Sequence, residues 1–162
     1  MEKPIKMTND KTPAAIVKKI TLRMKLFDKT LPKPEYKSNG AAAVDLYARV
    51  ETKIPAKGIG YIPLNIALQL PENYWALISA RSSLHKRGLM IANGVGVGDY
   101  DYCGPNDEYL AAVYNFTNSD VVIKKAERVA QLIVMFREPV EIELADDFDA
   151  PNRGGFGTTG KT

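Results

Sequence analysis

The sequence predicts an all-β fold, a barrel or a sandwich with one short helix, on three observations. Apolar and polar residues alternate with period two over residues 20–26, and side chains two residues apart share one face of a strand. Short apolar segments then recur along the chain, separated by turns rich in Gly, Pro, Asn and Asp. A helical pattern is confined to residues 81–87 and stops at Gly88, a residue type that often ends helices.

The individual elements follow from the same patterns. Residues 1–15 mix polar and charged side chains, and we expect them to form a flexible leader. Beyond the first strand, clusters of Ala, Val, Ile and Phe predict strands over 41–48, 121–123 and 128–136. Together, residues 16–148 are expected to form one β domain.

Composition excludes several kinds of site. The chain has 162 residues, a formal charge of +3, one cysteine and one histidine, which suits a single compact domain. Cys103 has no second cysteine with which to form a disulfide, and this favours a cytoplasmic location. A zinc site built from Cys and His is excluded, and a Ser-His-Asp triad could use only His85. The weak charge and the absence of an 18-residue apolar run argue against nucleic-acid and membrane partners.

The last segment, residues 149–162, is rich in glycine, and its one large apolar side chain is that of Phe156. Such a segment cannot bury enough surface to fold alone, so it is either a tail without a role or a flexible arm that orders on a ligand. Its final eight letters match the phosphate-loop pattern G-x-x-x-x-G-K-T. That motif acts between a strand and a helix, and the sequence ends at Thr162, so we do not expect an ATP- or GTP-binding loop.

Three further features are candidates for chemistry, and each also has a plain structural interpretation. Arg81, Ser82 and Ser83 stand at the expected helix start, where an anion could bind, although a Ser cap beside a surface Arg fits equally. Residues 93–102 hold glycines at alternate positions, which leaves room for a flat base or marks a strained hairpin. Gln131 interrupts an apolar run and either meets a ligand or faces solvent.

The order of these features resembles the five motifs of the trimeric deoxyuridine triphosphatase (dUTPase) family, in a branch typical of phages and Gram-positive bacteria. The matching segments are 41–48, 80–84, 93–104, 126–132 and 153–160. The resemblance implies a jelly-roll-like β-barrel of the β-clip type, a homotrimer with shared active sites, and an arm that closes over a neighbour's substrate. It implies hydrolysis of dUTP to dUMP and pyrophosphate with Mg²⁺ on the triphosphate.

The resemblance also implies roles for individual residues. Asp99 would orient the attacking water as general base, and Asp45 would contact Mg²⁺ through water. Tyr102 would pack under the deoxyribose, and Phe156 would stack on the base. The expected base contacts come from the hairpin: Asn93, Val97 and Gly98. The expected phosphate contacts are Arg81, Ser82, Ser83, Gln131, Arg153, Gly157, Thr158 and Thr159.

The chain departs from the family pattern at three places. Residues 105–107 are inserted after the hairpin, the arm motif is two residues shorter around Arg153, and Gly98 replaces a bulky aliphatic, which predicts a looser hairpin. A dCTP deaminase of the same fold is an alternative, but it needs an acid in the strand after the hairpin, and residues 109–114 carry none. A nucleotide-gated binder of a host regulatory protein is the other alternative.

Overall fold

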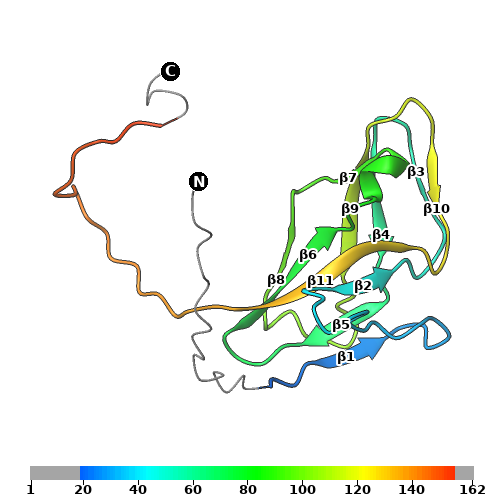
Figure 1. The fold of residues 1–162 in the computed structure, drawn as a ribbon, viewed down its shortest axis with the longest axis horizontal. Helices are drawn as coiled ribbons and strands as arrows, with labels where there is room; N and C mark the ends of the chain where they lie inside the picture. The colour runs from blue at the N-terminus through cyan, green and yellow to red at the C-terminus, as the bar shows by residue number, and fades with distance from the viewer. Residues whose placement is uncertain (1–18, 156–162) are drawn as a thin grey trace, which may run out of the picture.

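The computed structural model describes residues 19–155, and within them the chain is nearly all β, as predicted (Figure 1). The strands, in chain order, are β1 (Arg23–Leu26), β2 (Val44–Tyr47), β3 (Thr52–Ile54), β4 (Ile59–Pro63), β5 (Ile66–Gln69), β6 (Tyr74–Ala80), β7 (Leu89–Ile91), β8 (Gly96–Gly98), β9 (Leu110–Asn115), β10 (Val121–Ile123) and β11 (Arg128–Phe136). One 3-10 helix, η1 (Leu84–Arg87), lies between β6 and β7.

The strands pair in four antiparallel sheets, with most neighbours far apart in the sequence. The largest sheet has the order β2-β11-β6-β8, so that β11 lies between β2 and β6, and β8 forms one edge. A second sheet has the order β4-β9-β7, and the pairs β1-β5 and β3-β10 complete the set. This non-sequential order brings segments from the whole chain around one site.

A single hydrophobic core joins these sheets. Its members come from most of the strands and include residues with no exposed surface, such as Leu46, Ile62, Leu89 and Leu132. In β9 the burial alternates, because side chains two residues apart face the same side of the sheet. The alternation fixes which residues of each strand point to the core and which point outward.

Several boundaries differ from the sequence prediction. The first strand is predicted over 20–26, but its ladder with β5 covers only Arg23–Leu26. The segment 41–48 narrows to Val44–Tyr47, whereas the strands predicted at 121–123 and 128–136 are confirmed at both ends. The helix is confirmed only as a short 3-10 turn, and it ends at Gly88 in the left-handed conformation with φ 74°.

After β11 the chain leaves the body of the fold (Figure 1). Residues 137–154 are all exposed, and Val140, Ile142 and Leu144 show 83%, 85% and 94% of their surface to solvent. The predicted boundary between a domain at 16–148 and an arm at 149–162 stays a prediction. The predicted leader, residues 1–15, lies outside the described residues.

Candidate active site

The glycine-rich segment forms one wall of a pocket of about 250 Å³. The pocket is lined by Ile78, Asn93, Gly96, Val97, Gly98, Tyr102, Glu108, Tyr109 and Leu110. The structure thus brings together four residues that the sequence analysis assigned to the base and sugar site: Asn93, Val97, Gly98 and Tyr102. They meet because β8 pairs with β6 through Gly98 and Ala76, and the chain then turns back toward β9.

Asp99 directly follows β8 and is exposed; it is not part of the pocket lining, but its neighbour Gly98 is. Its backbone carbonyl accepts a hydrogen bond of 3.2 Å from the amide of Tyr102, which closes a turn. This turn sets the exposed carboxylate of Asp99 and the ring of Tyr102 close along the same loop. The hydroxyl of Tyr102 donates to the carbonyl of Glu108 over 3.3 Å, so the hydroxyl end of the ring is hydrogen-bonded to the segment that leads into β9.

Gly98 is backed by the ring of Tyr109. A Cβ placed on Gly98 would lie 2.5 Å from Cε1 and 2.7 Å from Cζ of Tyr109, and it would meet the hydroxyl oxygen as well. The sequence analysis expected a looser hairpin because Gly98 lacks an aliphatic side chain. That premise is wrong, because the ring of Tyr109 fills the space that such a side chain would take. Burial raises the pKa of Tyr109 to about 12, with Tyr102, Asp99, Asp107 and Cys103 contributing less. The sequence analysis did not single out Tyr109.

The inserted residues 105–107 form a compact turn instead of a loose loop. The carboxylate of Asp107 accepts the amide hydrogen of Gly104 over 2.7 Å, and the amide of Asp107 donates back to the carbonyl of Gly104 over 3.2 Å. The carbonyl of Pro105 accepts a hydrogen bond from the Lys25 ammonium. These contacts hold residues 104–107 in a fixed turn.

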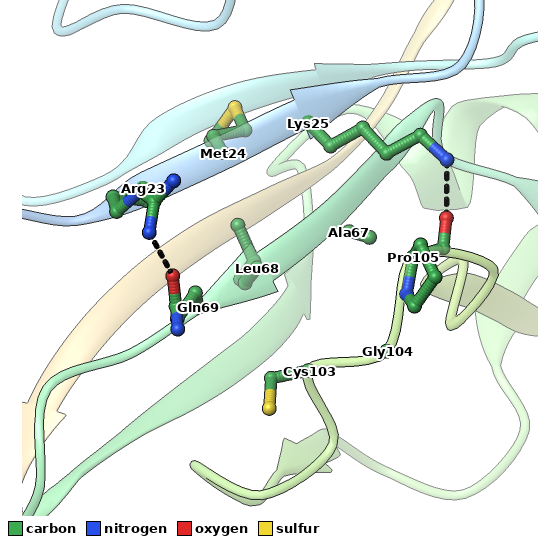
Figure 2. Close-up of a pocket in the computed structure, with 9 residues that line it drawn as sticks. All are labelled: Arg23, Met24, Lys25, Ala67, Leu68, Gln69, Cys103, Gly104 and Pro105. Atoms are coloured by element: carbon green, nitrogen blue, oxygen red, sulfur yellow. Dashed lines mark hydrogen bonds between the residues drawn. The ribbon is translucent and has the colours of Figure 1, made fainter.

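A second cavity, of about 200 Å³, lies on the other side of this turn (Figure 2). Figure 2 shows Cys103, Gly104 and Pro105 facing β1 and β5, with Lys25 reaching Pro105 and Arg23 donating to Gln69 over 2.7 Å. None of the residues predicted for substrate or metal binding lines it.

Asp45 joins two arginines into a charged cluster. One carboxylate oxygen accepts a hydrogen bond from Arg81 Nε over 2.8 Å, and the other accepts from an Arg128 guanidinium nitrogen over 2.9 Å. The register explains the meeting, because Gln131 of β11 lies opposite both Asp45 of β2 and Ser79 of β6. The side chain of Asp45 is only 14% exposed. The sequence analysis expected Asp45 and Arg81 in one site but not their direct ion pair.

The side chains around this cluster make a basic pocket of about 340 Å³. Its lining is Arg81, Ser83, Leu84, Lys86, Arg87, Glu127, Arg128 and Val129. Ser82 and Ser83 are both exposed, and Ser83 takes the N-cap position of η1, as the structural interpretation expected, but its side chain makes no capping hydrogen bond. Gln131 Nε2 donates to the carbonyl of Ala80 over 2.9 Å, which places its amide next to Arg81.

The predicted site residues therefore fall into two groups. The base and sugar group lines the first pocket. Of the predicted phosphate contacts, Arg81 and Ser83 line the basic pocket, whereas Ser82 and Gln131 are not part of its lining, and the two linings share no residue. Arg153 is exposed on the segment beyond β11. Phe156, Gly157, Thr158 and Thr159 lie outside the described residues.

Between residues 19 and 155, no three His, Cys, Asp or Glu side chains gather closely enough to hold a metal ion among them. In the same part of the chain, no helix has the length and apolar character needed to cross a membrane.

Comparisons with known proteins agree on one family. The sequence model of the dUTPase family matches residues 29–160. The deoxyuridine 5'-triphosphate nucleotidohydrolase of Dictyoglomus turgidum is 37% identical over 148 residues, covering 87% of this chain and 99% of that protein. The crystal structure of dUTPase from Streptococcus mutans superposes with a TM-score of 0.66 at 28% identity, covering 73% of this chain and 98% of that one.

A phage protein extends the likeness in fold. A mutant dUTPase from phage phi11 of S. aureus, described as coordinating a structural Mg(II) ion, superposes with a TM-score of 0.70 at 18% identity, covering 81% of this chain and all of that one (100%). The jelly-roll-like fold is thus shared across bacterial and phage proteins. With the family match spanning most of the sequence and the relatives aligned over nearly their full length, this chain belongs to the dUTPase family.

Proposed function

We propose that this protein hydrolyses dUTP to dUMP and pyrophosphate, with Asp99 as the general base. The observation that carries the proposal is the first pocket itself: its wall is the glycine-rich edge strand β8, the exposed Asp99 directly follows that strand, and the Asp99 carbonyl closes the turn to Tyr102, which also lines the pocket. The relatives are named for action on deoxyuridine 5'-triphosphate. The first pocket would take the base and the sugar of the nucleotide, and the separate basic pocket would take its phosphates.

Backbone groups of β8 are suited to reading the base. β8 is an edge strand, and within residues 19–155 no strand pairs with its outer side. An unpaired strand edge presents backbone donors and acceptors in a fixed row, which is a template for the polar edge of uracil. Cytosine would present a donor where uracil has an acceptor, and such mismatches can discriminate by about 10⁴-fold. Asn93, Val97 and Gly98 are assigned to this contact.

The sugar and phosphates complete the substrate. The exposed ring of Tyr102 is assigned to the deoxyribose, where it leaves no room for a 2′-hydroxyl. Arg81, Ser82, Ser83 and Gln131 are assigned to the phosphates, because the basic pocket gathers guanidinium groups and hydroxyls. The assignment of Phe156 to the base, and of Arg153, Gly157, Thr158 and Thr159 to the phosphates, rests on the family resemblance alone.

Mg²⁺ is the proposed cofactor, and the donor chemistry fits it. Mg²⁺ keeps several waters and usually takes one or two carboxylates together with substrate phosphates. Both oxygens of Asp45 already accept bonds from arginines, so a contact through water suits this carboxylate better than direct ligation. When bound, the ion would neutralise charge on the triphosphate.

The residues of this chain account for the reaction as follows. Asp99 accepts a proton from a water molecule while the water oxygen forms a bond to the α-phosphorus. The bond between the α-phosphorus and the bridging oxygen breaks, and pyrophosphate leaves with the electron pair. Arg81 and Arg128 stabilise negative charge on the phosphate oxygens, and Asp45 fixes the Arg81 guanidinium in position. Positioned general bases contribute about 10²–10⁴-fold to such rates.

A homotrimer with shared sites is the proposed assembly. The base pocket and the basic pocket of one chain have no lining residue in common, and the family resemblance assigns one substrate to residues of more than one chain. The exposed apolar residues Val140, Ile142 and Leu144 give the segment beyond β11 a face suited to a neighbouring subunit. A cytoplasmic location is part of the same proposal and rests on the lone Cys103.

A nucleotide panel tests the function directly. The protein with Mg²⁺ is offered dUTP, dCTP, dTTP and UTP, and pyrophosphate and ammonia are both measured. We expect pyrophosphate from dUTP and little from the other nucleotides. Release of ammonia from dCTP would instead show deaminase activity. The sequence of β9 argues against that activity, because it carries no acidic residue. Asp99→Asn should retain binding of a non-hydrolysable dUTP analogue while turnover falls by about 10² or more.

A matched control separates this effect from a general change in charge. Glu72→Gln also converts a carboxylate to an amide, at an exposed turn outside both pockets, and it should leave turnover as it is. Near-normal turnover in Asp99→Asn would remove Asp99 from the role of base.

A further inference from the structure

Gly98, the last residue of β8, and Tyr109, which directly precedes β9, compete for the same space. The Cβ that any other residue would carry at position 98 falls 2.5 Å from Cε1 of Tyr109, well inside van der Waals contact. The backbone of Gly98 is not in the left-handed region, so its conformation is one that other residues can adopt. The glycine is therefore required by the tyrosine behind it and not by the turn.

Tyr109 also supports the opposite side of the pocket. Its ring meets the ring of Tyr102 edge to face, with centroids 5.4 Å apart and an angle of 73° between the planes. One buried ring thus touches both the edge strand assigned to the base and the aromatic ring assigned to the sugar. These two contacts set the width of the cleft between Gly98 and Tyr102.

The backbone of Tyr109 is hydrogen-bonded to Ile66 and Leu64, but its ring is held by packing. The residue is only 6% exposed, and within residues 19–155 its hydroxyl oxygen is buried without a hydrogen-bond partner. An unpaired buried hydroxyl is unfavourable, so the side chain is retained for the volume and shape of its ring. Small residues at 96 and 98 leave β8 without side chains of its own on that face, and Tyr109 supplies the missing support.

We propose that Tyr109 is a positioning residue for nucleotide selection: its ring fixes the spacing between the β8 backbone and the Tyr102 ring. This inference deepens the proposed function and rests on it. With the ring removed, β8 and Tyr102 lose a shared support, and the cleft no longer holds the base and the deoxyribose at a fixed separation. Tyr109 does not touch the reacting phosphorus in this arrangement, so its loss acts on binding and selectivity more than on the chemical step.

The first experiment compares two substitutions at one position. Tyr109→Leu removes the ring, and we expect KM for dUTP to rise by about 3–10-fold, the range that an aromatic pair contributes, with a smaller change in kcat. The preference for dUTP over UTP, measured as the ratio of kcat/KM values, should fall by a similar factor. Tyr109→Phe keeps the ring and should restore both quantities to within about twofold of the original protein.

The controls separate positioning from other roles. Tyr114→Leu makes the same change within β9, the strand that follows Tyr109, at a position outside the pocket, and it should leave the preference for dUTP over UTP as it is. A merely structural role for Tyr109 would lower stability without altering that ratio, and such a result would overturn the proposal. A loss of affinity in Tyr109→Phe equal to that in Tyr109→Leu would also overturn it, because the hydroxyl would then be the group that matters.

A second experiment exchanges the volumes of the two positions. Gly98→Val alone should lower the melting temperature because its side chain collides with Tyr109, whereas Gly98→Val combined with Tyr109→Val should recover much of the loss. If the change in melting temperature in the double variant equals the sum of the changes in the two single variants, the contact between the two positions is refuted. This measurement needs no turnover, so it stands even if the protein fails to hydrolyse dUTP, an outcome that would refute the proposed function and the selectivity role together.

Discussion

Glu108 is the point where three hydrogen bonds converge, and replacing it with alanine tests how the chain stabilises the back of the base pocket. Its carboxylate accepts from Arg49 over 2.7 Å and 2.8 Å and from the amide of Asn65 over 3.0 Å. The bonds to Glu108 raise the pKa of Arg49. The Glu108 side chain is 12% exposed and that of Arg49 is 32% exposed, so the pair is partly screened by solvent.

The expected cost follows from these contacts. The amide of Asn65, a residue that is 2% exposed, would lose its partner in Glu108→Ala at a cost of about 1–3 kcal/mol. The partly screened ion pair adds about 1 kcal/mol, which gives about 2–4 kcal/mol in all. For a domain of this size, each kcal/mol lowers the melting temperature by about 2–4 °C, so we expect a fall of about 5–15 °C.

The assay is thermal unfolding followed by circular dichroism at a fixed protein concentration. Glu108→Gln keeps an acceptor for Asn65 and should lose less than half as much as Glu108→Ala. Glu72→Ala, at an exposed turn, serves as the control and should change the melting temperature little. A fall of under about 2 °C in Glu108→Ala would refute the reasoning, because the three bonds would then contribute almost nothing.

Three further predictions address the site and its surroundings. Tyr102→Ala should let UTP act as a substrate, and an unchanged preference in kcat/KM for dUTP over UTP would assign that ring to packing alone. Deleting residues 151–162 should leave a folded oligomer by size-exclusion chromatography with poor turnover, and full activity would show that the arm has no role. Hydrogen bonds from Lys125 and Thr30 hold the pKa of Asp28 in the folded protein well below its usual value near 3.8. The Asp28 carboxylate therefore stabilises the fold fully above pH 3.8, and this stabilisation is lost as the pH falls from there toward the pKa of the folded state. Asp28→Asn should therefore flatten the loss of melting temperature below about pH 4, and an unchanged slope would contradict the pairing.

Local patterns predicted the strands that lie between clear turns. β10 and β11 have the predicted bounds because each is a run of apolar residues between polar turns. The first strand is shorter than its alternation suggests, since its length depends on where β5 begins and ends, about forty residues later in the chain. The same dependence on a distant partner shortened the segment at 41–48.

The site was predictable as a set of residues but not as a set of contacts. The order of motifs singled out part of each pocket lining, Asn93, Val97, Gly98 and Tyr102 in one and Arg81 and Ser83 in the other. It gave no sign of the bond between Asp45 and Arg128, which joins positions 83 residues apart. Only the pairing of β11 with β2 brings them together. Tyr109 carried no signal of its own, because its role depends on the absence of a side chain at Gly98.

In the proposed trimer, the segment beyond β11 makes the stability of the fold depend on protein concentration. A lone chain leaves Val140, Ile142, Leu144 and Phe148 at least 80% in water, and burying them against other copies would release that water. Mass action then couples folding to association, so the midpoint of thermal unfolding should climb as the sample becomes more concentrated and drop on dilution.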